Sequence, residues 1–99
     1  MQTIGLGDLA AAARALMAVH ETRRAPLLRR LMDEADLADR FRRRQGRAHP
    51  VYGNGTLMSA ALARPQAKPP ANDDVEYLAC LAQAIEAVLD RRGTGAAHD

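Results

Sequence analysis

The stretch from Pro26 to Gly46 constrains the fold most strongly. Its apolar residues recur every three or four positions, which is the spacing of one buried face of an α-helix. Oppositely charged residues four positions apart support the same helix, although each exposed pair contributes only about 0.3–0.5 kcal/mol. We therefore predict a turn over residues 22–25 and a helix from Pro26 to about Gln45, ended by Gly46. The stripe comprises Leu27, Leu28, Leu31, Ala35, Ala38 and Phe41, and the pairs are Arg29/Asp33, Arg30/Glu34, Asp36/Arg40 and Asp39/Arg43.

Leu37 departs from this pattern because it projects toward the charged face of the helix. Either the buried stripe is widened by packing against two neighbouring elements, or Leu37 contacts a partner. We favour the first interpretation and keep Leu37 as a candidate contact.

Three further apolar patterns predict three more helices. The first helix spans roughly residues 8–20, with His20 closing its stripe, and the second is a short helix capped by Asn54 or Thr56 and ended by Pro65. The last begins with a capping box of Asp73 and Glu76 and ends near Arg92, with Gly93 as its cap. The three stripes are Leu6, Leu9, Ala13, Leu16, Met17 and His20; Leu57, Met58, Ala61 and Leu62; and Val75, Leu78, Leu81, Ala82, Ile85, Val88 and Leu89.

The last helix has the broadest apolar face, so we expect it to be the most buried. Its other side carries the smaller groups Tyr77, Cys80, Ala84 and Ala87. These would let a second helix approach closely, either from this chain or from another copy in a homodimer. Cys80 has no basic neighbour within its helical turn, so we interpret it as a packing residue and not as a nucleophile.

The composition fits a single small all-α domain. The chain has 99 residues, of which 21 are alanine and only three are aromatic, so its core must be built from aliphatic side chains. We predict a bundle of three main helices and one short helix. Residues 65–72 form a proline-rich link, the ordered core covers about residues 6–92, and residues 93–99 form a frayed tail.

Cysteine usage and hydropathy bear on the compartment. Cys80 is the single cysteine, so no intramolecular disulfide can form and a reducing, cytoplasmic location is expected. The sequence shows neither a basic signal-peptide start nor an uncharged apolar run of the length that spans a bilayer. We expect no membrane association.

The clearest binding signal is a basic cluster at the end of the Pro26 helix. The net charge of the whole chain is only +2, so this local concentration of arginines matters more than the total charge. Guanidinium groups pair with phosphates, but they also stabilise any helix C-terminus and bind acidic protein surfaces. A helix-turn-helix motif is disfavoured because about ten residues separate Gly46 from the next helix. The cluster comprises Arg40, Arg42, Arg43, Arg44 and Arg47.

The turn from Gly46 to Thr56 is rich in glycine and proline. It lacks the spacing and the lysine of a P-loop, so capping and tight packing explain it better than phosphate binding does. His49 and Tyr52 have no identifiable catalytic partner, and we expect them to form structural hydrogen bonds.

Two segments resemble a known family: RRQGRAHPVYGNGTLMSAALARP and DDVEYLACLAQAIEAVL. They resemble small proteins encoded in the head-gene region of alphaproteobacterial gene transfer agents, which are phage-like particles that package host DNA. The similarity covers residues 9–92. It implies a cytoplasmic accessory to capsid assembly or DNA packaging, with capsid, portal or packaging proteins as partners, and it implies no active-site residues.

The sequence as a whole favours a non-enzymatic protein-interaction or assembly factor that needs no metal or cofactor. The alternative is a small nucleic-acid-binding protein that uses the Arg40–Arg47 cluster. The sequence shows no paired carboxylates, no metal-ligand cluster and no nucleophile with an adjacent base, so nothing in it indicates an enzyme. The expected contact surface joins the basic helix end to the turn after it and comprises Arg40, Arg43, Arg44, Arg47, His49, Tyr52, Asn54 and Leu37.

Overall fold

The computed structural model describes residues 1–97, which form four α-helices. These are α1 (Leu6–Met17), α2 (Glu21–Gln45), α3 (Leu57–Leu62) and α4 (Val75–Ala97). Residues 1–97 contain no β-strand, only an isolated bridge between His49 and Gly53. The prediction of an all-α fold with three main helices and one short helix is confirmed. None of the helices in this range is both long and apolar enough to cross a membrane.

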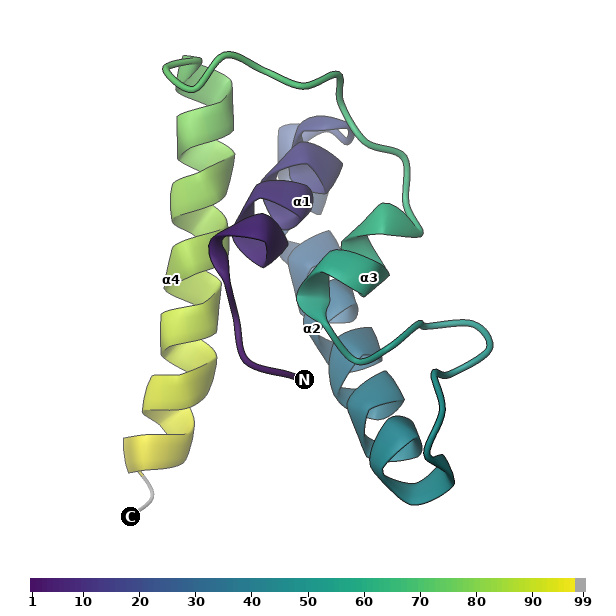
Figure 1. The fold of residues 1–99 in the computed structure, drawn as a ribbon. Coiled ribbons are helices and arrows are strands. Elements are labelled where there is room, and N and C mark those ends of the chain that lie inside the picture. The colour runs from purple at the N-terminus through teal and green to yellow at the C-terminus, as the bar shows by residue number, and fades with distance from the viewer. Residues whose placement is uncertain (98–99) are drawn as a thin grey trace.

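The long helices α2 and α4 run in the same direction, and α1 lies between them (Figure 1). Ion pairs fix this arrangement, because Arg24 near the start of α2 pairs with Glu76 near the start of α4. Further along, Asp36 of α2 pairs with Arg91 of α4. The short α3 packs against both α1 and α2. Helix α4 therefore stands at one edge of the molecule.

Helix α1 is the centre of the core, and the prediction that the last helix is the most buried is wrong. The alanines of α1 are buried around most of the circumference of this helix, which lets the other three helices pack closely against it. By contrast, Leu6 of the predicted stripe is 85% exposed. The buried apolar residues of α1 are Ala11, Ala12, Ala13, Ala15 and Leu16.

The boundary between α1 and α2 also differs from the prediction. His20 does not close the first helix but caps the second, since its Nδ1 accepts a hydrogen bond from the backbone N–H of Thr22. With this cap, α2 begins at Glu21, and Pro26 lies inside the helix. The predicted stripe of α2 is confirmed at Leu28, Leu31, Ala35 and Ala38, which are buried, while Leu27 and Phe41 are half-buried. Gly46 ends the helix as predicted, with φ at +70°.

Helix α4 packs mainly with its smaller side chains inward, so the predicted buried face is right only at Val88, which is buried, and at Leu81, which is half-buried. Cys80, Ala84 and Val88 are buried against the core. Val75, Leu78, Ile85 and Leu89 of the predicted face are exposed. Alanines on α1 and α4 let these two helices approach closely, as expected for the small-residue side. Because burial raises the pKa of the Cys80 thiol, the structure agrees with a packing role for this residue.

Both ends of α4 are shifted from the prediction. Asp74, not Asp73, caps the helix by accepting a hydrogen bond from the N–H of Tyr77, and Glu76 instead pairs with Arg24. The helix continues through Gly93 to Ala97, so the predicted tail is helical over residues 93–97, and residues 98–99 lie outside the described range. Gly93 does not have the positive φ of a helix cap.

The proline-rich link between α3 and α4 is irregular and is fixed to α1. Arg14 donates hydrogen bonds from Nε and Nη2 to the carbonyl oxygen of Ala67, at 3.0 and 2.9 Å. The amide of Gln66 donates to the carbonyl oxygen of Ala11. These contacts carry the chain back over α1 so that α4 can pack on the other side of it (Figure 1).

Candidate binding surface on the outer side of helix α2

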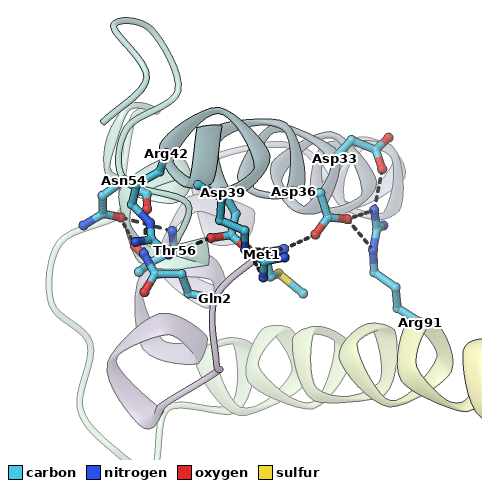
Figure 2. A network of polar contacts seen from close by, with 10 residues as sticks. Met1, Gln2, Asp33, Asp36, Asp39, Arg42, Asn54, Thr56 and Arg91 are labelled. Carbon is cyan, nitrogen blue, oxygen red and sulfur yellow. Dashed lines mark hydrogen bonds and ion pairs between the residues drawn. The ribbon is translucent and has the colours of Figure 1, made fainter. Parts of the chain in front are cut away.

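Most acidic side chains of α2 form ion pairs with other elements (Figure 2). Asp36 accepts hydrogen bonds from the α-ammonium group of Met1 and from Arg91, and Asp33 also pairs with Arg91. Burial alone would raise the pKa of Asp36, but the hydrogen bonds and charges of these two cations hold it below its usual value. Glu34 pairs with Arg64 beyond α3. Of the four ion pairs predicted within α2, the structure therefore contains one, between Asp39 and Arg43.

Asp39 is the most buried of these acids, with 2% of its surface exposed. Its Oδ1 lies 3.1 Å from Arg42 Nη2, and its Oδ2 lies 2.8 Å from Arg43 Nη2 and 3.7 Å from the Met1 ammonium nitrogen. Burial would raise its pKa, but the hydrogen bond from Arg42 and the charge of Arg43 lower it below the usual value. Arg42 and Arg43 are thus engaged with Asp39, which makes Arg43 the least available of the predicted contact arginines.

The turn after α2 is held together by His49. Its Nδ1 accepts hydrogen bonds from the N–H groups of Val51 and Tyr52, both at 3.0 Å. Its ring meets Phe41 edge-on and stacks on Tyr52, with 4.9 Å between centroids in each case. The prediction that His49 forms structural hydrogen bonds is confirmed. Tyr52 instead supports the turn through its backbone N–H and its half-buried ring, and its hydroxyl forms no hydrogen bond with any other residue from 1 to 97.

The glycine-rich segment packs tightly and caps α3, as predicted. Thr56 Oγ1 accepts a hydrogen bond from the N–H of Ser59, while the side-chain oxygen of Asn54 accepts from both the N–H and the hydroxyl of Thr56. Gly55 has φ at +91°, and a Cβ there would lie 2.7 Å from the Cα of Asp39. Asn54 is exposed, but its carboxamide oxygen is occupied within the turn.

An open hollow of about 190 Å³, which we call the basic hollow, lies between the C-terminal end of α2 and His49 of the turn. Leu37 is 42% exposed, so the favoured interpretation that it is packed in a widened buried stripe is wrong. Phe41 is half-buried beside it. Within residues 1–97, Arg40, Arg44 and Arg47 form no ion pair. The Cζ of Arg47 lies 5.9 Å from the centroid of Phe41, within cation–π range. The lining residues are Leu37, Arg40, Phe41, Arg44, Gln45 and His49.

The arginines of the hollow continue a row along the outer face of α2 that sequence reasoning missed. Arg23, Arg29 and Arg30 are also exposed and form no ion pair with any other described residue. The sequence assigned Asp33 and Glu34 to Arg29 and Arg30, whereas these acids pair with Arg91 and Arg64. Spacing within one helix could not reveal these competing cations.

A second concavity lies at the other end of α2. This open groove of about 540 Å³ has an apolar floor and three arginines on its rim. Arg64 on that rim is already paired with Glu34. The groove is lined by Ala15, Val19, Thr22, Arg23, Pro26, Leu27, Arg30, Arg64 and Pro65.

Residues 2–88 match the family described as a domain of unknown function, DUF7742. The chain belongs to the DUF7742 family. The match includes α1, α2, α3 and most of α4, so the basic hollow lies within the DUF7742 domain. No curated protein and no solved structure matches the chain. Across residues 1–97, no three His, Cys, Asp or Glu side chains gather as ligands for a metal ion.

Proposed function

We propose that this DUF7742 protein is a non-enzymatic interaction factor that binds an acidic segment of a partner protein at the basic hollow. The observation that carries the proposal is the juxtaposition of exposed Leu37 with Arg40 and Arg44, neither of which is paired within residues 1–97. Such a site offers an apolar contact to one side chain and charge-assisted hydrogen bonds to neighbouring carboxylates. The resemblance to gene transfer agent proteins makes capsid, portal and packaging proteins the first partners to test.

Preorganisation supports this proposal. The left-handed backbone conformation of Gly46 ends α2, and the hydrogen bonds accepted by His49 hold the turn beside it. A partner that binds there would order little additional backbone, so less conformational entropy would oppose binding. The hollow is also small, which suits one apolar side chain and not an extended ligand.

The proposal is tested by affinity capture from the native host after nuclease treatment. Arg44→Ala and Leu37→Ala should each weaken capture by about 30-fold, because a central interface contact contributes about 2 kcal/mol. Arg23→Ala is the matched control, since it removes an exposed arginine from the opposite end of the same helix. If both hollow variants recover the same proteins in wild-type amounts, the binding surface lies elsewhere.

Nucleic-acid binding is the second candidate, and the row of exposed arginines along α2 favours it. Asp33, Glu34, Asp36 and Asp39 of α2 form ion pairs, so they would repel phosphates less than the sequence suggested. This function predicts micromolar binding to random oligonucleotides that falls steeply between about 50 and 200 mM salt. Arg23→Ala should then weaken binding as much as Arg44→Ala, while Leu37→Ala should not. Fluorescence anisotropy with duplex and single-stranded probes distinguishes the two functions.

A further inference from the structure

The outer face of α4 carries an apolar row that is separate from the basic hollow. Val75 is 82% exposed, Leu89 is 62% exposed, and Leu78, Ala82 and Ile85 are exposed between them. The inner face of the same helix is already covered by α1. Four large apolar side chains of α4 are therefore exposed. The helix itself stands at the edge of the molecule (Figure 1).

The spacing of this row is that of a coiled-coil seam. Positions 75, 78, 82, 85, 89 and 92 are separated alternately by three and four residues, which places them at successive a and d positions of a heptad. An ordinary surface helix has no need for a second seam of this regularity when its inner face is already packed. The outer seam, defined as Val75, Leu78, Ala82, Ile85, Leu89 and Arg92, therefore fits another helix.

The charges at the two ends of the seam favour one orientation of a second α4 helix. Asp73 precedes the seam and Arg92 ends it, and neither forms an ion pair with any residue from 1 to 97. In a parallel pair of α4 helices, Asp73 and Asp74 of the two copies would meet at one end and repel each other. In an antiparallel pair, this acidic end would meet Arg92 of the second copy at both ends of the seam, and the helix dipoles would also oppose each other favourably.

We propose that two copies of this chain associate through antiparallel packing of their outer seams. The best register places Leu78 opposite Leu89 of the second copy. In this register the small Ala82 also lies opposite the large Ile85 of the second copy. Arg92 then lies over Val75 of the second copy, with its guanidinium group near Asp73. The contact is isologous and closes at two copies.

The seam is one helix wide and about 26 Å long, since helices rise about 1.5 Å per residue. This is smaller than the interface of a typical stable dimer, so a dissociation constant on the order of 10 μM is expected. Sedimentation equilibrium of the full chain from low micromolar to millimolar concentration should show the mass rising from 10.7 kDa toward twice that value.

Ile85→Asp and Leu78→Asp should each leave the protein monomeric throughout that range. Because 39% of Ile85 and 46% of Leu78 are exposed, the melting temperature measured below the dissociation constant should fall by no more than about 8 °C. Leu62→Asp is the matched control, as it places the same charge at an exposed leucine of α3 and should associate like the wild type. At low salt, Arg92→Asp should weaken association about tenfold, and the additional change Asp73→Arg should restore it.

Three outcomes overturn the proposal. A wild-type mass of 10.7 kDa at millimolar concentration would assign the seam to a different protein. A dimer that survives Ile85→Asp would place the contact elsewhere. A charge-reversal pair that does not recover association would reject the antiparallel register.

Discussion

Replacing Gly55 by alanine tests the packing that holds the glycine-rich turn against α2. Gly55 has φ at +91°, a conformation that costs an L-residue about 1–2 kcal/mol. A Cβ at this position would also lie 2.7 to 2.9 Å from the Cα, Cβ and N of Asp39. The Cα and N belong to the backbone of a long helix and cannot move aside as a flexible side chain could, so overpacking should add about 1–3 kcal/mol. We expect Gly55→Ala to destabilise the fold by about 2–5 kcal/mol in total.

Gly46→Ala is the matched control, because Gly46 also has a positive φ, at +70°, but a Cβ added there would meet no atom within 4 Å. It should cost only the conformational term of about 1–2 kcal/mol. Urea unfolding followed by circular dichroism gives both values, and each kcal/mol should lower the melting temperature by about 4–8 °C in a domain of this size. If Gly55→Ala is no more destabilising than Gly46→Ala, the turn does not pack on α2 as the structure shows.

Three further comparisons test the core and its charges. Leu31→Ala should cost about 2–5 kcal/mol because this side chain is fully buried, whereas Leu37→Ala should cost less than about 1 kcal/mol; equal losses in thermal melts would contradict the exposure of Leu37. Ala84→Leu should destabilise by about 1–3 kcal/mol and Ala82→Leu by less than about 0.5 kcal/mol, and the reverse order would mean that α4 packs with its other face inward. Asp39→Asn should cost about 1.5–3 kcal/mol at pH 7. Because the pKa of Asp39 is lowered by folding, its contribution is complete above the unfolded value of about 3.9 and is lost as the pH falls through the folded value, so chemical denaturation should show the two proteins converging in acid.

The presence of the four helices could be predicted from the sequence because the apolar residues of each helix recur periodically and clear end signals flank them. The buried stripe of α2 was largely predicted, as was the stop at Gly46, and Thr56 was one of the two predicted candidates for the cap of α3. These features depend on neighbouring residues along the chain, and such local rules are visible in one sequence. The start of α2 was missed because a histidine cap is not among the strongest helix-start signals.

The orientation of α4 could not be predicted by the same rules. Both of its faces carry apolar residues at heptad spacing, and the larger side chains favoured the wrong one. The choice depends on α1, whose buried alanines accept the smaller face that contains Cys80 and Ala84. Hydrophobic size alone contains no information about the shape of the neighbouring helix.

The candidate surface was predicted in outline and not in detail. Leu37, Arg40 and Arg44 do line one hollow, while Arg43 is tied to Asp39 and the side-chain oxygen of Asn54 is used within its turn. The unpaired state of Arg29 and Arg30 within residues 1–97 was missed because Arg91 and Arg64 bind the acids assigned to them. Such competition between cations is set by tertiary structure and leaves no signal in local spacing.

The most direct test of protein binding at the basic hollow is photocrosslinking in the native host, with a photoreactive amino acid at position 37. A matched probe at position 68 replaces an exposed lysine in the link before α4, away from the hollow. We expect a discrete adduct at position 37 that resists nuclease, is absent from position 68 and disappears when Arg44 is changed to alanine. An adduct that nuclease removes, or an equal protein yield from both positions, would contradict protein binding at this hollow.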